Sequence, residues 1–325
     1  MPPIRHTQSY LRSLFAQRGI TPQRRLGQNF LIDLNIHDLI VKASGAGSND
    51  VILEVGSGTG ALTLQLAELG AVVVAVDVDP AMARLTAEAV AGMANARVLN
   101  LDALKNKNTI NPALLDNVRA GLAAGTGERF KIVANLPYQI ATPVITNFLI
   151  HPELCPALMV VTIQRELAER LCAEPASSSY GAVSVVVQAL ADVSIVRSLP
   201  PSVFWPRPKV DSAVVAIEPN AAKRVAVGDV AWFHDFVRRV FLHRRKYLRH
   251  GLAEIWRDRW AKAEVDVWLE SQGLSGQVRA EALDIEEFLT LAHALRERWG
   301  ALPQAAAGTA KGHQPAHEPE NECEQ

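Results

Sequence analysis

The stretch VILEVGSGTGALTLQLAEL, residues 51–69, joins an apolar run to three closely spaced glycines and then to an amphipathic pattern. The run at 51–55 has the length of a buried strand, and Leu62, Leu66 and Leu69 recur at helical spacing. Glycine lets a backbone approach a ligand closely, and the first turn of a helix offers unpaired N–H groups. The stretch therefore predicts a strand, a ligand-binding loop and a helix, although a tight turn without a ligand would have the same pattern.

Four more short apolar runs follow, with helical patterns between them. They are AVVVAVD, which ends at Asp77, RVLNL, which ends before Asp102, FKIVAN, which ends at Asn135, and ALMVVTI at 157–163. Apolar strands that alternate with helices are typical of a parallel sheet covered on both faces. We predict a doubly wound α/β domain, in which VDSAVVAIEP (210–219) is a late strand that closes the sheet.

The composition fits a soluble globular protein: of 325 residues, 49% are apolar and 21% charged, and the formal net charge is −1. Cys155, Cys172 and Cys323 form neither a pairable pattern nor a metal-binding spacing, which favours a reducing compartment and no bound metal. No apolar run is long enough to span a membrane. We expect a cytoplasmic protein. Its acid-poor N-terminus could also be a transit peptide, an arm that touches RNA or an exposed lead-in.

The two ends and the C-terminal third differ from the α/β region. No Asp or Glu precedes Asp33, so we interpret 1–23 as a basic arm and 24–220 as the α/β domain. Residues 227–300 hold five of the six tryptophans and no strand pattern, which predicts a small α-helical domain. Residues 301–325 hold almost nothing to bury, which predicts a disordered tail.

The helical domain is expected to begin with one helix over about 231–252, with apolar side chains on one face and basic ones on the other. The basic face comprises Arg238, Arg239, Arg245, Lys246 and Arg249. Arg244 lies within the apolar arc, and we expect it to tie the helix to the α/β domain. The connector at 103–129 is interpreted as a tolerated surface insertion, with a short helix around 112–122.

Ligand-type groups follow three consecutive strands. Asp77 ends the second strand, where a carboxylate can accept both hydroxyls of a ribose, and Asp102 stands at the end of the third. With Gly56 and Gly58 they predict one cleft at the carboxyl ends of the sheet. The glycines read G-x-G-x-G rather than the dinucleotide pattern G-x-G-x-x-G, and no G-x-x-x-x-G-K-[ST] loop is present. The expected ligand is an adenosine without a pyrophosphate, although Asp77 alone could be a helix cap.

The segment NLPY, residues 135–138, follows the fourth strand at the same edge of the sheet. The side-chain oxygen of Asn135 accepts hydrogen bonds, and Pro137, which lacks an N–H, can leave the Leu136 carbonyl facing the cleft. Tyr138 offers a flat ring. Two acceptors and a ring suit a planar –NH2 group such as the exocyclic amine of adenine, whose lone pair they would localise toward a methyl donor. A turn asparagine and a core tyrosine are the alternative interpretation.

Several motifs together resemble those of the ribosomal RNA adenine dimethyltransferase family. They are GQNFL (27–31), EVGSGTGALT (54–63), NLPY (135–138), PPSVFWPRPKVDSAVV (200–215), RRK (244–246) and RAE (279–281). The resemblance runs from about Arg24 to Leu295. It implies a Rossmann-like, S-adenosylmethionine-dependent domain with a small helical RNA-binding domain. It also implies transfer of two methyl groups to each of two adjacent adenosines near the 3′ end of small-subunit (16S-type) rRNA, in the immature subunit, during ribosome biogenesis.

The resemblance also assigns roles to single residues. The cofactor would be lined by Asn29, Leu31, Gly56, Gly58, Asp77, Asp102 and Asn135. The catalytic set would be Asn135, Leu136, Pro137, Tyr138 and Phe204. Phe204 would stack on the flipped adenine opposite Tyr138. Arg24 and Arg25, with the basic helix face, would hold RNA phosphates, although a solvated helix face would have the same charges. Asp77 departs from the Glu of many members, and Gly-Ser-Gly replaces the commoner Gly-Pro-Gly.

Two other functions stay open at this stage. A related enzyme could act on large-subunit rRNA and give macrolide resistance, but the KVDSAVV and RRK segments favour the small-subunit substrate. A non-catalytic RNA-binding assembly or transcription factor of the same fold would not need an intact NLPY. The expected enzyme is a monomer that needs no metal.

Overall fold

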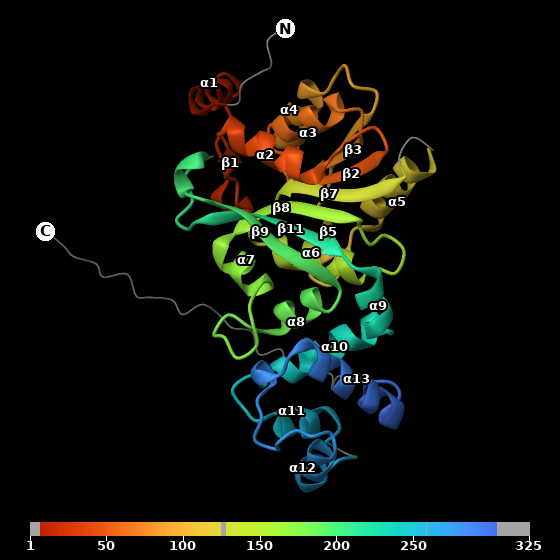
Figure 1. The fold of residues 1–325 in the computed structure, drawn as a ribbon. Helices are drawn as coiled ribbons and strands as arrows, with labels where there is room; N and C mark the ends of the chain where they lie inside the picture. The colour runs from red at the N-terminus through yellow and green to blue at the C-terminus, as the bar shows by residue number, and fades with distance from the viewer. Residues whose placement is uncertain (1–6, 125–127, 258, 304–325) are drawn as a thin grey trace, which may run out of the picture.

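The computed structural model describes residues 7–124, 128–257 and 259–303. Its centre is a seven-stranded sheet within the described residues (Figure 1). In spatial order the strands are β4 (Ala96–Asn100), β3 (Val72–Asp77), β2 (Asp50–Val55), β7 (Arg129–Asn135), β8 (Leu158–Gln164), β11 (Ser212–Pro219) and β9 (Ala191–Leu199). The first five are parallel, and β11 runs antiparallel to β8 and β9.

The strand order places a topological switch point between β2 and β7. The chain fills the sheet from β2 through β3 to β4, and then returns to the other side of β2 with β7 and β8. In open α/β sheets, ligands bind at the carboxyl ends of the strands beside such a reversal. The predicted doubly wound α/β fold is therefore confirmed, and the fold itself marks the edge of the sheet where a site is expected.

The sequence pattern missed strand β9, and β11 is not the strand that closes the sheet. Only the two ends of β9, Ala191 and Leu199, are buried. Inside it, Ile195 and Val196 are 39% and 36% exposed. An edge strand that faces solvent carries no continuous apolar run, so nothing in the local pattern distinguishes it from a loop.

Two sets of helices cover the sheet (Figure 1). On one face lie α2 (Leu34–Ser44), α3 (Ala61–Glu68) and α4 (Pro80–Ala89). On the other lie α5 (Pro112–Ala123), α6 (Ala141–Ile150), α7 (Arg165–Leu171) and α8 (Ala182–Gln188). Asp79 and Asn111 cap α4 and α5, each with a proline at the first helical position. Helix α5 confirms the short helix expected in the connector, which also holds the hairpin β5 (Leu104–Asn106) and β6 (Thr109–Ile110).

The N-terminal segment is not an extended basic arm. Helix α1 (Gln8–Arg18) begins at the cap residue Thr7 and buries Leu11 and Phe15. The Phe15 ring contacts those of Phe30 and Trp205 edge-on, with centroids 5.3 and 5.4 Å away. The acid-poor composition suggested a free arm, but these two apolar side chains fix the helix to the α/β domain. Residues 1–6 of the expected arm lie outside the described residues.

The C-terminal part is helical, as expected. Its elements are α9 (Ala221–Val227), α10 (Val230–Phe241), α11 (Leu248–Ile255), α12 (Lys262–Ser271), the short 3₁₀ helix η3 (Ala280–Ala282) and α13 (Ile285–Trp299). The single helix expected over 231–252 is wrong, because the chain turns at 242–247. The Leu248 N–H donates to the Val278 carbonyl at 2.7 Å, which pulls α11 away from the axis of α10. Apolar spacing persists on both sides of the turn, so periodicity could not reveal it.

One continuous core joins the two parts: the cluster that fills the α6–α8 face of the sheet extends through α10, α11 and α13. Arg244 donates to the Ser178 carbonyl and to the Glu281 carboxylate, both at 2.7 Å. The Tyr180 hydroxyl donates to the Leu283 carbonyl at 3.0 Å. Arg244 therefore ties the two parts together, as expected. Of the expected tail, residue Pro303 still accepts a hydrogen bond from Arg239, and 304–325 lie outside the described residues.

Candidate active site

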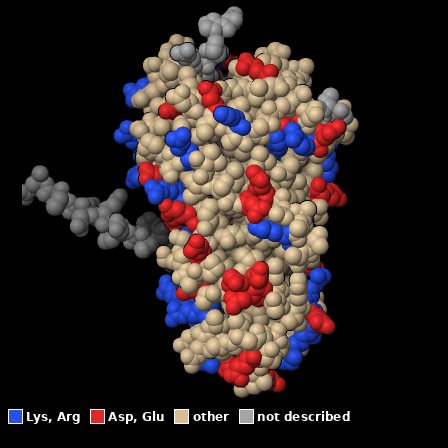
Figure 2. Space-filling view, in the orientation of Figure 1, with Lys and Arg blue, Asp and Glu red and all other residues tan. Residues whose placement is uncertain are grey.

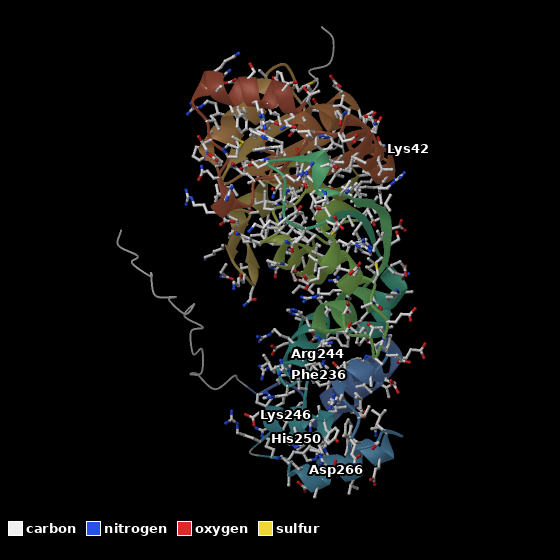
Figure 3. All side chains as sticks on the ribbon, turned by 90° about the vertical axis from the view of Figure 1, so that its left-hand side faces the viewer. Lys42, Phe236, Arg244, Lys246, His250 and Asp266 are labelled. Atoms are coloured by element: carbon white, nitrogen blue, oxygen red, sulfur yellow. The ribbon has the colours of Figure 1, made fainter. Side chains whose placement is uncertain are left out.

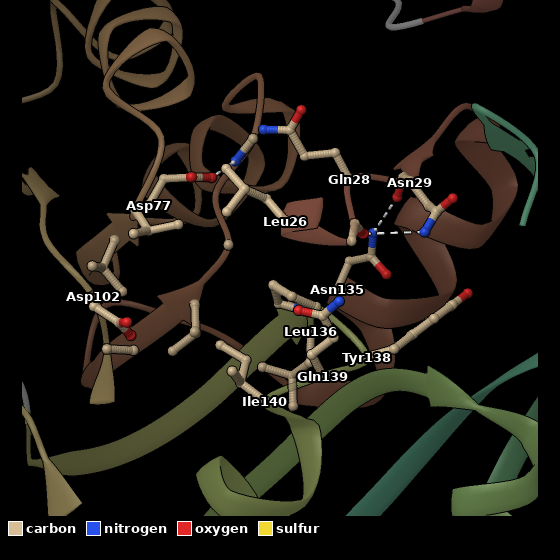
Figure 4. A pocket seen from close by; sticks show the side chains of 18 of the residues that line it. Leu26, Gln28, Asn29, Asp77, Asp102, Asn135, Leu136, Tyr138, Gln139 and Ile140 are labelled. Atoms are coloured by element: carbon tan, nitrogen blue, oxygen red, sulfur yellow. Dashed lines mark hydrogen bonds between the residues drawn. The ribbon is translucent and has the colours of Figure 1, made fainter. Parts of the chain in front are cut away.

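A cavity of about 200 Å³ lies at the carboxyl ends of β2, β3 and β7 (Figure 4). It is lined by Leu26, Gly27, Gln28, Asn29, Phe30, Val55, Gly56, Gly58, Val76, Asp77, Val78, Leu101, Asp102, Ala103, Asn135, Leu136, Pro137, Tyr138, Gln139 and Ile140. The cavity brings together GQNF, GSGTG, both aspartates and NLPY, which lie far apart in the sequence. None of the described residues that line it is a lysine or arginine.

The glycine loop follows β2 and packs directly on the N-L-P-Y turn. Gly56 has φ +82°, and a Cβ there would lie 2.9 and 3.0 Å from the Cδ and Cγ atoms of Pro137. Gly60 likewise has no room, because a Cβ would lie 2.9 Å from the Thr86 Cα in α4. The absence of a side chain at Gly56 thus lets the Pro137 ring pack against the loop, and its absence at Gly60 lets helix α4 pack there. The loop is shaped by its neighbours as well as by its own turn.

Asp77 ends β3 and is 9% exposed. Its Oδ2 accepts the Gly58 N–H and its Oδ1 accepts the Asp79 N–H, both at 2.9 Å. Burial raises the pKa of this carboxyl, and the two backbone N–H groups oppose that rise. Each oxygen keeps a second lone pair, so the carboxylate can hold the glycine loop and still accept hydrogen bonds from a ligand.

The far end of the cavity suits a flat, partly polar ring. Val78 follows Asp77 and is 47% exposed, an unusual position for a large aliphatic side chain beside a buried carboxylate. Leu101 and Ala103 flank Asp102, whose Oδ1 accepts the Leu104 N–H at 2.9 Å. A carboxylate that can accept the ribose hydroxyls, an apolar slot and a second carboxylate together form a lining that fits an adenosine.

Asn135 ends β7 with its amide held in one orientation. Its Nδ2 donates to the Asn29 carbonyl at 3.0 Å. A carbonyl only accepts, so the amide nitrogen must face Asn29 and the Oδ1 atom is left as a free acceptor in the described structure. The contact uses the backbone carbonyl of Asn29, whose own side chain donates its Nδ2 to the Gly27 carbonyl at 3.1 Å.

The rest of the N-L-P-Y turn also lines the cavity. The Leu136 N–H donates to the Thr162 carbonyl at 3.1 Å, and within the described residues no hydrogen bond uses the Leu136 carbonyl. The Pro137 carbonyl accepts the Ile140 N–H at 3.0 Å, which closes the turn. The Tyr138 ring lines the cavity next to them (Figure 4).

Two expected site residues, Leu31 and Phe204, do not line the cavity. Leu31 in β1 (Phe30–Leu31) pairs with Phe204 in β10 (Phe204–Trp205), and the two side chains are 5% and 3% exposed. Both belong to the apolar cluster between the sheet and α2–α3. In this structure Phe204 therefore has no face open for stacking. Pairing with β1, which sequence periodicity cannot show for a two-residue strand, decides this orientation.

Sequence reasoning missed Gln28 and the apolar lining. Gln28 donates to Asp79 Oδ2 at 2.8 Å and accepts the Gln23 N–H at 2.7 Å, so it joins the segment before β1 to the cap of α4. The GQNFL motif (27–31) contained the signal, but it was used only for Asn29 and Leu31. Val78, Leu101 and Ala103 each stand next to a predicted carboxylate, and that adjacency could have identified them.

Glu54, under the glycine loop, is buried and accepts the Thr63 hydroxyl at 2.5 Å. Burial raises its pKa from 4.5 to about 8. The folded chain therefore holds a proton that the unfolded chain releases above pH 4.5, and the free energy of unfolding should fall as pH rises from about 4.5 to 8.

We expect Glu54→Gln, which cannot ionise, to gain stability relative to the native chain over this range, by on the order of a few kcal/mol. Urea unfolding of both chains at pH 5 and pH 8 measures the difference directly, because buried histidines contribute equally to the two. Equal changes in the two chains would show that Glu54 ionises at an ordinary pH.

Among the residues expected to bind RNA, some form ion pairs with acidic side chains and others do not. Arg24 and Arg25 are exposed in the 3₁₀ helix η1 (Arg24–Leu26), which leads into the cavity lining. Arg238 and Arg239 pair with Asp235 in the same helix, and Arg249 pairs with Asp266 at 3.0 Å. Neither Arg245 nor Lys246, in the turn at 242–247, forms an ion pair within the described residues. The continuous basic helix face is thus wrong, and an exposed basic turn replaces it.

The basic turn lies on one side of the elongated molecule. Figure 2 shows blue side chains mainly along the edges of the molecule, including the left-hand edge, and separate acidic groups scattered over a mostly tan middle. Figure 3 looks onto that left-hand side, where Arg244, Lys246 and His250 lie on the helical part. The structure describes no helix long and apolar enough to cross a membrane, and no cluster of three potential metal ligands among the described residues.

A switch-point cavity with a ribose-type carboxylate and an N-L-P-Y turn defines the class of Rossmann-like methyltransferases. The family model for ribosomal RNA adenine dimethylase matches residues 20–297. The chain belongs to this family.

Known relatives agree with this membership. Ribosomal RNA small subunit methyltransferase A of Pelotomaculum thermopropionicum is 37% identical over 290 residues, 89% of this chain and 97% of the relative. Its namesake in Geobacillus thermodenitrificans is 37% identical, over 87% and 94%. A solved dimethyladenosine transferase from Plasmodium falciparum has a TM-score of 0.67 at 25% identity, over 82% of this chain and 97% of the other. The 23S rRNA methyltransferase ErmE shares the fold, with a TM-score of 0.56 at 23% identity over 82% and 99%.

Proposed function

We propose that this enzyme uses S-adenosylmethionine to dimethylate the exocyclic amines of two adjacent adenosines near the 3′ end of small-subunit rRNA, during ribosome biogenesis. The observation that carries the proposal is the orientation of Asn135. Its free Oδ1 lies in the same cavity as Asp77, so an amine acceptor and a nucleoside site adjoin. Relatives that are 35–37% identical over most of the chain are named as small-subunit enzymes.

The cavity divides into two roles. Asp77, Asp102 and the apolar slot of Val78 and Leu101 would hold the adenosine of S-adenosylmethionine, with Asn29 and Gly56 nearer its methionine end. When bound, this cofactor supplies a methyl group on a sulfonium, which is a good leaving group. No ion pair or metal is required of the protein for that chemistry.

The N-L-P-Y turn would act on the target base. The Asn135 Oδ1 and the Leu136 carbonyl accept the two hydrogens of the amine and turn its lone pair toward the methyl group, while the Tyr138 ring supports the base. The amine's proton can pass to water, so the site needs positioned acceptors rather than a general base. The target adenosine must leave its stack to reach the cavity, as in other base-modifying enzymes.

The proposal includes a docking surface for RNA, formed by the basic turn at 242–247 together with Arg24 and Arg25. It also includes an immature small subunit as the partner and a cytoplasmic monomer as the acting form. Large-subunit methylation is the second candidate, supported only by the shared fold of ErmE.

Mass spectrometry of both ribosomal RNAs from a strain that lacks this gene tests the proposal. Loss of dimethyladenosine from small-subunit rRNA alone is expected, with recovery when the gene is restored. Loss from large-subunit rRNA would favour the second candidate, and unchanged dimethyladenosine in both would indicate a non-catalytic RNA-binding factor.

Lys246→Glu should weaken binding to small-subunit rRNA and reduce the slope of log affinity against log salt by about 1, because one fewer counterion is released. Lys42→Glu is the matched control, since this exposed lysine at the end of α2 gives the same change of net charge on another part of the surface (Figure 3). Binding titrations at several salt concentrations should separate the two variants. Equal salt slopes for the two variants would show that the turn at 242–247 is a solvated surface that does not bind RNA.

A further inference from the structure

The hydroxyls of Tyr138 and Ser212 are hydrogen-bonded at 2.6 Å, between the N-L-P-Y turn and the start of strand β11. Ser212 is completely buried, although it is a small polar residue. Burial raises the pKa of Tyr138, which keeps its hydroxyl protonated around neutral pH. The contact is therefore a short bond between two neutral hydroxyls.

The serine is a fixed anchor. Ser212 pairs with Gln164 in β8 and with Leu199 in β9, so sheet partners hold its backbone on both sides. The other end of Tyr138 is fixed by the closed turn at Pro137, whose carbonyl accepts the Ile140 N–H. A tyrosine that is held at its Cα and at its hydroxyl has the long axis of its ring fixed, and because a phenol O–H lies in the plane of its ring, the direction of the hydrogen bond also favours one ring plane.

We propose that Ser212 is a positioning residue, which fixes the position of the Tyr138 ring against the target base through the hydrogen bond between the two hydroxyls. The inference rests on the proposed methyl transfer and adds a residue that does not line the cavity. It matters most for the second methylation, because a monomethylated amine offers only one hydrogen to the two acceptors. The base then depends more on the face against which it lies.

Three variants test the proposal: Ser212→Ala, Tyr138→Phe and the double variant. Each removes the same hydrogen bond and keeps an aromatic ring at position 138. Single-turnover methylation of small subunits that lack dimethyladenosine, with mono- and dimethyladenosine measured separately, gives the two rates. We expect Ser212→Ala to slow the second transfer about three- to tenfold, the scale of one hydrogen bond, and to change the first by less than about twofold. Tyr138→Phe should lower the ratio of the second rate to the first by a similar factor.

The double variant distinguishes positioning from simple structural support. If Ser212 acts through the tyrosine hydroxyl, adding Ser212→Ala to Tyr138→Phe should change neither rate further. S-adenosylmethionine affinity, measured by calorimetry, should stay the same in Ser212→Ala, because Ser212 does not line the cavity. A further loss in the double variant, or a normal second transfer in Ser212→Ala, would overturn the proposal.

Ser184→Ala is the matched control. Ser184 in α8 is also completely buried, donates a 2.6 Å hydrogen bond to the Arg170 carbonyl in α7 and accepts the Gly181 N–H at 3.0 Å, and it does not line the cavity. It should cost comparable stability and leave the ratio of the two rates unchanged. If the native chain transfers no methyl group at all to small subunits, the proposed function fails. If it is active and Ser212→Ala matches it, only the role of Ser212 is rejected.

Discussion

Asn135→Ala should lower the rate of methyl transfer at saturating cofactor by about 10²–10³, as for the loss of one preorganised polar group in a transition state. The reason is the fixed orientation of the amide. Its nitrogen is occupied by the Asn29 carbonyl at 3.0 Å, so its oxygen is already aimed before the base arrives. Loss of this acceptor leaves the Leu136 carbonyl alone to grip the amine.

The measurement is single-turnover methylation of small subunits with the cofactor in excess, because Asn135 also borders the cofactor region and its loss can weaken cofactor binding. Asn95→Ala is the matched control. Its Nδ2 likewise donates to backbone carbonyls, those of Ala67 and Ala71 at 2.8 and 2.7 Å, but far from the cavity. It should lose stability and keep its rate. Near-native dimethylation by Asn135→Ala would show that the N-L-P-Y segment is a structural turn with no part in the chemistry.

Asp77→Ala should weaken S-adenosylmethionine binding by at least about 1.5–3 kcal/mol, the scale of hydrogen bonds to a charged group. The structure adds a second cost, because the same carboxylate accepts the Gly58 N–H and so shapes the glycine loop. Asp77→Asn keeps one acceptor and a similar volume, so its loss of affinity should be smaller. Calorimetry on the folded variants measures both.

The control for Asp77 is Asp192→Ala on strand β9. That aspartate accepts hydrogen bonds from Asn220 and Lys223 on the far edge of the sheet, and its loss should leave cofactor affinity unchanged. Native affinity in Asp77→Ala would remove this carboxylate from the cofactor site. Equal losses in Asp77→Ala and Asp192→Ala would point to general instability instead.

The sequence alone determined those parts of the protein that depend on local patterns. An apolar strand has a recognisable length, and a parallel sheet brings the residues that end its strands to one edge. The positions of Asp77, Asp102 and Asn135 at strand ends therefore predict one shared cleft. The motif spacing also supported the family, because the motifs span most of the chain.

Only the tertiary structure decided how side chains are turned and what covers them. The free oxygen of Asn135 depends on a carbonyl 106 positions away. Phe204 and Leu31 face the core because two short strands pair, and α1 is held by two aromatic contacts. The break between helices α10 and α11 at 242–247 follows from a backbone hydrogen bond between Leu248 and Val278. Such features arise from contacts between distant segments of the chain. Periodicity and composition do not record these contacts, because they describe only residues that are neighbours in the sequence.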